Sequence, residues 1–340
     1  MIRPPFALGA LSVLFAFFAG PSAQDLAATP PDTNRAGETT LEAGGAPEAV
    51  AALRDIVARQ KAALAEGKAK TEAVDLEDVR PKLQRVIDDY ERLLTRYPNF
   101  AAGWAAYGLF LCDPLVEDHK TALALLLKAN GLDGEIPVVK NQIGVILAEQ
   151  GRAIDALNYF LAAADLAPAE PLYHFQIGLV LSEGRADFQK SKAWTPAVID
   201  RTLLDAFARA VSLAPERTDF AYRAAESYYD LAEPRWEEAY RAWTRLEERL
   251  EGRLETQTVR LHRARTLWKQ GLAADARELL ATVDASELAG QRTKLVAEFD
   301  ADDAAEKAAR EHPVAPAPAA PPALDAEAKV AFPAPVAPAK

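Results

Sequence analysis

The side chains most able to do chemistry in this sequence are its 4 histidines and its 1 cysteine. His119, His174, His262 and His312 lie far apart, and none of them has a second metal-ligand residue at a regular spacing. A zinc site needs several His or Cys ligands at short intervals. We therefore expect packed or surface histidines rather than metal ligands.

An acidic stretch near the carboxyl end is the nearest approach to a cation site. Residues 300–303, with Glu311 further on, partly match the ligand spacing of a calcium-binding loop. Ala304 and Ala305 stand where such a loop needs an oxygen ligand and its turn glycine. The pattern favours the solvated face of a helix.

No motif for covalent or phosphate chemistry occurs. The sequence lacks a phosphate-binding glycine loop, a nucleophile elbow and a zinc-helix motif. Cys112, next to Asp113-Pro114, is more typical of a buried small hydrophobe than of a thiol that pairs with a partner. We expect a non-enzymatic protein with no cofactor and no bound metal.

Composition narrows the class of partner. The net charge of -11 argues against binding to nucleic acid phosphates or anionic membrane surfaces. Apolar residues make up 50 % of the chain, alanine is abundant, and β-branched runs are scarce, so helix is the default expectation. A protein or peptide is therefore the expected partner, not nucleic acid.

The first 23 residues resemble a secretory signal peptide. Arg3 precedes an apolar run over residues 6–19, and small residues with Pro21 follow it. Cleavage after Ala23 puts Pro21 at the third position before the cut, so cleavage after Ser22 or a retained anchor stays open. We expect an exported protein, periplasmic or secreted, with no permanent membrane insertion after cleavage. Residues 24–46 lack periodicity and are expected to be a flexible linker.

The elements that would position any site are set by an internal repeat. A short motif around a glycine occurs three times, as Trp104-x2-Tyr107-Gly108-x2-Leu111, Lys140-x2-Ile143-Gly144-x2-Leu147 and His174-x2-Ile177-Gly178-x2-Leu181. The glycines of the last two copies are separated by about 34 residues, which is the length of one helix–turn–helix repeat. A period of this length indicates stacked helix pairs, each too small to bury its own apolar face.

A pattern of small and aromatic residues follows each copy, with constant spacing within the pattern itself, and parts of it recur in a fourth and a fifth repeat. They are Ala122 in repeat one, Ala156, Phe160, Ala163 and Pro168 in repeat two, Phe207, Ala210 and Pro215 in repeat three, Ala239 and Trp243 in repeat four, and Ala276 in repeat five. The pattern resembles the tetratricopeptide repeat (TPR) family, in which a small residue lies where two helices meet and an aromatic wedge follows. The resemblance implies an all-α, right-handed superhelix (an α-solenoid) of about five to six helix pairs over residues 47–290.

Two segments depart from the regular repeat. A first, divergent pair is expected from a helix at 47–65 and a motif around Tyr90. Repeat three carries extra residues with Phe188 and Trp194, and Thr195-Pro196 predicts the start of a helix over 196–213. The insertion is expected to pack over that helix, and the alternative is a lid over a groove.

The family resemblance also implies a concave groove lined by the first helix of each pair. By register, its lining residues are Asn141, Val145 and Glu149 in repeat two, Phe175 and Leu179 in repeat three, Tyr222, Glu226 and Tyr229 in repeat four, and Leu261, Arg265 and Trp268 in repeat five. Phe175, Tyr222, Tyr229 and Trp268 are the expected anchors for a peptide. The alternative is that these side chains bury against a following helix or the insertion.

The function that follows is a protein-interaction scaffold of the bacterial-type cell envelope. The alternative is an accessory domain of polysaccharide or peptidoglycan machinery that binds glycan in the same groove. A capping helix is expected over 291–311. The Pro- and Ala-rich tail 312–340 is expected to be disordered, and it could reach a groove or serve as a spacer.

Overall fold

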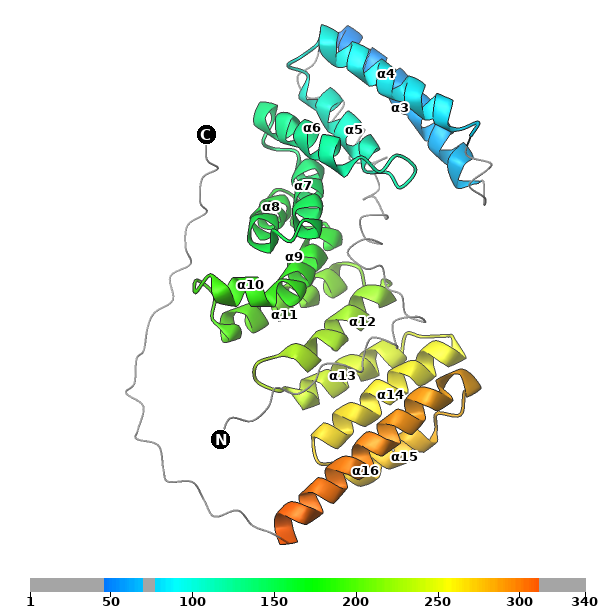
Figure 1. The fold of residues 1–340 in the computed structure, drawn as a ribbon, viewed down its shortest axis with the longest axis vertical. Coiled ribbons are helices and arrows are strands. Elements are labelled where there is room, and N and C mark those ends of the chain that lie inside the picture. Colours follow the sequence, from blue (N-terminus) through cyan, green and yellow to red (C-terminus); the bar gives the residue numbers. More distant parts are fainter. Residues whose placement is uncertain (1–45, 70–76, 312–340) are drawn as a thin grey trace. The chain divides into compact units, whose positions relative to one another are not determined.

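The computed structural model describes residues 46–69 and 77–311 (Figure 1). All regular structure in these ranges is helical. The predicted signal peptide, most of the predicted linker and the predicted tail lie outside the described residues. The described chain forms two compact units, one up to Arg235 and the other from Trp236.

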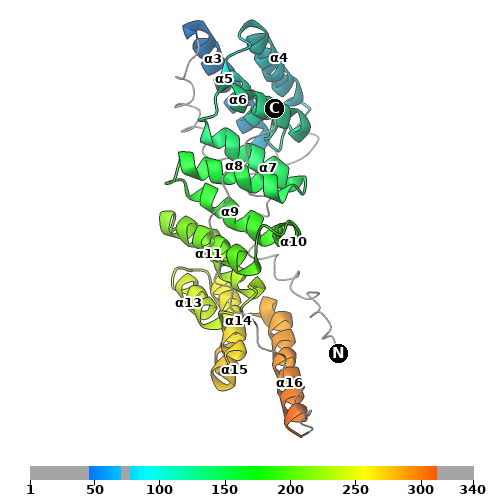
Figure 2. The ribbon, with the colours of Figure 1, turned by 90° about the vertical axis from the view of Figure 1, so that its left-hand side faces the viewer.

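Unit 1 is a succession of helices that stack in chain order (Figure 2). Its helices are α3 (Pro47–Lys68), α4 (Arg80–Arg96), α5 (Ala101–Leu111), α6 (His119–Leu132), α7 (Pro137–Glu149), α8 (Ala153–Leu166), α9 (Pro171–Glu183), α10 (Arg185–Lys190), α11 (Pro196–Leu213), α12 (Thr218–Glu226) and the 3-10 helix η3 (Ser227–Asp230). The pairs with the most extensive contact are α5 with α6, α7 with α8, and α9 with α11. These are the three helix pairs that the glycine motifs predict.

Unit 2 contains the last helices of the described chain. They are α13 (Trp236–Glu247), α14 (Arg253–Lys269), α15 (Ala273–Ala281), the 3-10 helix η4 (Ser286–Leu288) and α16 (Ala289–Glu311). Helix α14 packs against both α13 and α15. Helix α16 covers the predicted capping segment and begins slightly before it, at Ala289.

Each repeat glycine lets the second helix of its pair approach closely. A Cβ built on Gly144 would lie 2.6 Å from the Phe160 ring, and one on Gly178 would lie 2.7 Å from Phe207. Gly108 has the same relation to the smaller Leu126, at 2.7 Å. The rings of Phe160 and Phe207 are buried by this contact. Glycine and an aromatic wedge are therefore complementary parts of one helix–helix contact.

Proline and glycine set the ends of several helices. Pro137, Pro171 and Pro196 each stand in the first turn, where the missing N–H has no helical partner to lose. Gly151 and Gly271 have φ of 73° and 79° in the turns that lead into α8 and α15. This left-handed backbone is the conformation that glycine adopts at least cost.

The insertion in repeat three forms the short helix α10, which contacts the expected α11 but packs more extensively against α9 and α8. Phe188 is fully buried, and Trp194 lies edge-on to it with ring centroids 5.5 Å apart. Helix α10 contacts α8, α9 and α11, two of which are second helices of their pairs. The insertion thus contacts helices of two successive pairs. Helix α11 has the predicted bounds, and the Thr195 hydroxyl accepts a hydrogen bond from the Val198 amide at 3.3 Å.

Repeat four differs from the expected arrangement. The sequence predicts that the helix around Tyr222 and the helix of Ala239 and Trp243 form one pair within a single domain over 47–290. The unit boundary at Arg235 falls between them, after an irregular segment that contains Pro234. Within unit 2, the helix that contains Trp243 packs against α14.

Candidate functional site

The predicted groove residues of unit 1 are mostly covered. The first helices of the pairs supply them, from α7, α9 and α12. The exposed fractions run from 1 % to 7 % for Asn141, Val145, Phe175, Leu179 and Tyr222. These side chains contribute to packing in the described chain, which is the alternative that the sequence left open.

Phe175 shows why an aromatic groove is not displayed. Its ring stacks on Phe220 of α12, with centroids 4.2 Å apart and planes 13° from parallel. It also lies 5.5 Å from the Phe207 ring of α11. Contacts with α11 and α12 bury the Phe175 side chain, so the expectation of an exposed Phe175 anchor is wrong.

The predicted groove residues of unit 2 are covered by α16. Leu261 is 4 % and Trp268 8 % exposed. The Trp268 ring stacks on Phe299 with centroids 4.1 Å apart, and its Nε1 donates a hydrogen bond to Asp302 at 2.9 Å. Arg265 donates to Glu298 at 2.7 Å. Trp268 is thus also wrong as an exposed anchor.

The charged groove residues of unit 1 remain closer to solvent than Asn141 and the apolar ones. The Glu149 carboxylate lies 3.0 Å from Nδ1 of His119, and the two side chains are 18 % and 34 % exposed. Partial burial raises the pKa of Glu149, and His119 opposes that shift. The pair joins the start of α6 to the end of α7.

A second polar cluster joins α9 to α12. Arg223 donates to Glu226 at 2.7 Å and lies 3.7 Å from Glu183. Its Nη2 is also 3.5 Å from the Ser182 hydroxyl. Tyr229, on η3, is half-buried. Sequence reasoning missed Glu183 and Arg223, although Glu183 follows Glu149 by one repeat period and the repeat could have identified it.

One acid of each polar cluster lies at the carboxyl end of a helix. Glu149 and Glu183 are the last residues of α7 and α9. A carboxylate at a helix carboxyl end meets the negative end of the helix dipole, which is locally unfavourable by about 0.3–1 kcal/mol. The folded chain offsets part of this cost with His119 and Arg223. We define Glu149, Glu183, Arg223 and Glu226 as the polar edge of unit 1.

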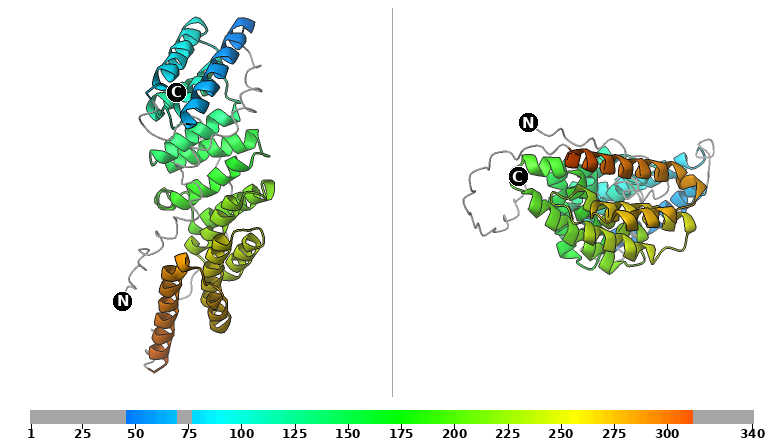
Figure 3. Two further views of the ribbon diagram at one scale, coloured as in Figure 1. Left: turned by 90° about the vertical axis from the view of Figure 1, so that its right-hand side faces the viewer. Right: turned by 90° about the horizontal axis from the view of Figure 1, so that it is seen from below.

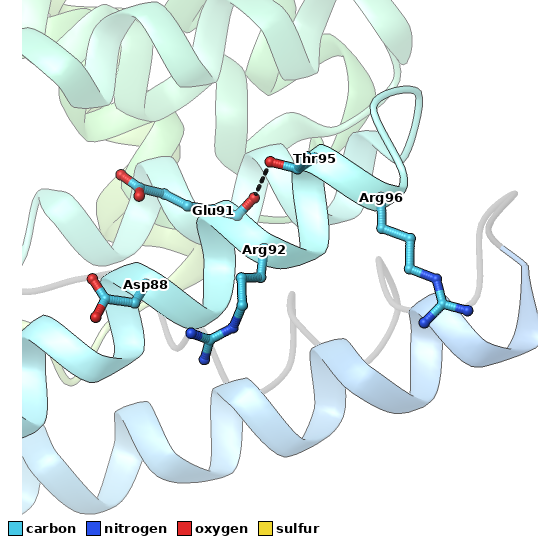
Figure 4. Close-up of a pocket in the computed structure, with 5 residues that line it drawn as sticks. All are labelled: Asp88, Glu91, Arg92, Thr95 and Arg96. Carbon is cyan, nitrogen blue, oxygen red and sulfur yellow. Dashed lines mark hydrogen bonds between the residues drawn. The ribbon is translucent and has the colours of Figure 1, made fainter.

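A shallow hollow on α4 is a weaker candidate. It is lined by Asp88, Glu91, Arg92, Thr95 and Arg96, which all come from one helix (Figure 4). The Thr95 hydroxyl donates to the Glu91 carbonyl at 2.7 Å, and Arg92 pairs with Asp89. These side chains point in different directions and do not converge on a common point.

The described histidines and the cysteine do not form a chemical centre. His262 is buried and stacks on Trp243 at 4.2 Å, and desolvation lowers its pKa to about 3. His174 lies 2.9 Å from the Pro168 carbonyl, and His312 lies outside the described residues. Burial raises the pKa of Cys112 to about 12, and its Sγ donates to the Gly108 carbonyl at 3.3 Å. Within the described ranges, no group of three or more His, Cys, Asp or Glu side chains could hold a metal ion.

The acidic stretch 300–303 is helical. Asp302 contacts Trp268 and Lys269, and Arg277 donates to both Asp300 and Asp303. Each of these carboxylates therefore has a cationic partner on α14 or α15, and the stretch forms no loop around a cation. None of the helices in the described ranges combines the length and the apolar character that crossing a bilayer requires.

Comparison with known proteins identifies solved structures with a similar fold but assigns no activity to this chain. No protein-family model matches the chain, and neither does any curated protein. Among solved structures, it is similar to YrrB, a TPR protein with an unusual peptide-binding site, at 15% identity and TM-score 0.47, over 57% of this chain and 90% of that one. PilW, a type IV pilus biogenesis factor, gives 13% identity and TM-score 0.47, over 71% and 97%. Pseudomonas aeruginosa PilF gives 18% identity and TM-score 0.45, over 72% and 97%.

The chain's own geometry carries the fold assignment. Repeats one to three each form a helix pair, and the glycine on the first helix of each pair faces the predicted wedge residue of the second helix. This is a tetratricopeptide-like helical repeat protein.

Proposed function

We propose that this chain is a non-enzymatic protein-interaction scaffold of the cell envelope, which binds a segment of a partner protein along the first helices of unit 1. Stacked helix pairs generally serve as extended binding surfaces. The main support for the proposal is the polar edge. Its side chains lie on three successive first helices and are partly exposed to solvent.

The polar edge suits recognition through hydrogen bonds and charge. Arg223 can donate to a peptide carbonyl or carboxylate, whereas Glu149 and Glu183 accept from backbone amides or from basic side chains. Both carboxylates lie at a helix carboxyl end, where their interaction with the helix dipole is unfavourable. A cation from a partner would relieve that cost. The buried aromatics then act as the rigid support behind the contact surface.

Affinity capture with a matched pair of variants tests the proposal. The bait is the chain from Gln24, compared with Glu183→Lys on the polar edge and Asp165→Lys on α8. Asp165 is exposed and makes no ion pair within the described part of the chain. We expect the wild-type and Asp165→Lys baits to retain an envelope protein. The Glu183→Lys bait should not retain it. Equal retention by all three baits would remove the polar edge from the proposal.

The glycan alternative is less well supported. Sugar rings stack on exposed aromatic faces, but the rings of Phe175 and Trp268 already stack on Phe220 and Phe299. A soluble peptidoglycan fragment added to the capture should therefore leave the retained protein unchanged.

Location in the envelope rests on the amino-terminal sequence. We propose that export removes the first 22 or 23 residues. Mass spectrometry of the protein from the envelope fraction should give an amino terminus at Ala23 or Gln24. An intact Met1 would contradict cleavage.

A further inference from the structure

The end of the repeat array in unit 2 is covered by a helix with an unusual charge pattern. Helix α16 follows α14 in repeat register, since Leu295 lies one repeat period after Leu261 and Asp302 lies one period after Trp268. It occupies the place of a further first helix, and no second helix pairs with it in the described chain. Figure 3 shows α16, in orange, running alongside the yellow α14.

The apolar part of this contact is confined to the amino half of α16, where Val296 is also partly buried. Leu295 and Phe299 are the buried apolar side chains of α16, with 4 % and 0 % exposure. From Asp300 to the end of the helix, each residue whose side chain is described is exposed. The carboxyl half of α16 therefore adds little apolar burial to its attachment.

The remainder of the contact is electrostatic. Arg265 pairs with Glu298 at 2.7 Å, and Lys269 pairs with Asp302 at 3.2 Å. Arg277 of α15 donates to Asp300 and Asp303 at 2.8 Å and 2.9 Å, and its guanidinium lies 5.1 Å from the Trp268 ring centre.

These pairs are partly exposed, with side-chain exposure of 33 % for Lys269, 39 % for Arg277 and 49 % for Asp302. Partly exposed pairs are screened by salt and contribute little each to stability. Four acids on one helix thus meet three bases and an indole on the array through exchangeable contacts.

We propose that the surface formed by Arg265, Trp268, Lys269 and Arg277 is a docking site for an acidic amphipathic helix of a partner protein, which α16 occupies as an exchangeable self-ligand. Charge complementarity identifies the occupant, since the bound helix presents one aromatic ring to Trp268 and carboxylates to each base. The inference concerns unit 2 alone and does not depend on the polar edge of unit 1.

A labelled peptide with the sequence of residues 289–311, added to the full-length chain, tests the proposal. Asp302→Lys weakens the chain's own α16, because it removes the contacts to Trp268 and Lys269. Glu311→Lys makes the same charge change on the same helix at an exposed residue with no ion pair in the described ranges. We expect Asp302→Lys to bind the peptide at least about tenfold more tightly than wild type or Glu311→Lys, which corresponds to about 1.4 kcal/mol.

Adding Arg277→Glu to Asp302→Lys should abolish peptide binding. Equal affinity of all variants, or no binding by Asp302→Lys, would overturn the proposal. A concentration-dependent doubling of mass in the wild-type chain, lost in Asp302→Lys, would assign the site to α16 of a second copy and would overturn the partner assignment.

Hydrogen exchange on the wild-type chain gives a test that needs no variant. We expect amides of residues 300–311 to exchange at least about tenfold faster than those in the middle of α14, and faster again at high salt. Equal protection of both helices at low and high salt would show that α16 is a fixed part of the fold, and would refute its exchange.

Discussion

The ring of Phe160 lies so close to Gly144 that a Cβ on this glycine would be 2.6 Å from the ring's Cε1. The contact joins the first helix of repeat two to the second. Gly178 and Phe207 repeat the relationship in the next pair at 2.7 Å. A side chain at either glycine would have to separate the two helices or move a buried ring.

We predict that Gly144→Leu destabilises the chain by more than about 1 kcal/mol through overpacking. Gly131→Leu is the matched control, because a Cβ at that residue of α6 meets no atom within 4 Å. Urea unfolding followed by circular dichroism measures both changes. An unchanged midpoint for Gly144→Leu would show that α7 and α8 do not pack as described.

The buried ion pair of Asp200 and Arg185 gives a second prediction. Asp200 lies 2.6 Å from Arg185, accepts a hydrogen bond from the Ala232 amide at 2.8 Å, and has a side chain that is 7 % exposed. Asp200→Ala leaves a mostly buried guanidinium without its carboxylate, so a loss of about 3–5 kcal/mol is expected.

Asp205→Ala provides the comparison for this ion pair. Asp205 pairs with Arg201 on the same helix, but both side chains are more than three-quarters exposed, at 76 % and 78 %. Its removal should cost no more than about 1 kcal/mol. Similar losses for the two variants in thermal unfolding would contradict the structural role of Asp200.

Local signals made the helix pairs predictable from the sequence. Thr195-Pro196 sets the start of α11, and the predicted range of 196–213 matches the helix. A contact of Gly144 with Phe160 is predicted because the glycine motif recurs around Gly178 and the pattern around Phe160 recurs around Phe207, after the insertion of repeat three. Such features depend on residues close in sequence, whose geometry is nearly independent of the rest of the fold.

Exposure of the groove residues was not predictable in the same way. Periodicity places Phe175 and Trp268 on a helix face, but the residues that cover them, Phe220 and Phe299, belong to helices much later in the chain. Only the packing of later helices decides whether such a face is open. For the same reason the boundary after Arg235 had no clear signal in the sequence.

The thiol of Cys112 is predicted to react slowly in the folded chain. Its side chain is buried and burial raises its pKa to about 12, so very little thiolate forms near neutral pH. Labelling with a maleimide should be slow in buffer and fast in denaturing urea. This is the only cysteine in the sequence, so mass spectrometry gives an unambiguous count. Rapid labelling in buffer would contradict burial.

The stack of His262 on Trp243 predicts how unit 2 responds to acid. Desolvation lowers the pKa of His262 to about 3, from an ordinary value of 6.5. Between these two pKa values the imidazole is protonated in the unfolded chain but not in the folded chain. The free energy of unfolding therefore falls as the pH drops from about 6.5 towards 3. With these folded and unfolded pKa values of His262, the free energy of unfolding should fall by about 2 kcal/mol between pH 7.5 and pH 5.

His262→Phe keeps an aromatic ring against Trp243 and removes the titration. We expect wild type to lose about 2 kcal/mol more than His262→Phe when urea unfolding is compared at pH 7.5 and pH 5. His174→Phe, at a histidine that lies near the surface and contacts the Pro168 carbonyl, is the control and should retain the wild-type pH dependence. If His262→Phe has the same pH dependence as wild type, the buried imidazole is not the group that destabilises unit 2 in acid.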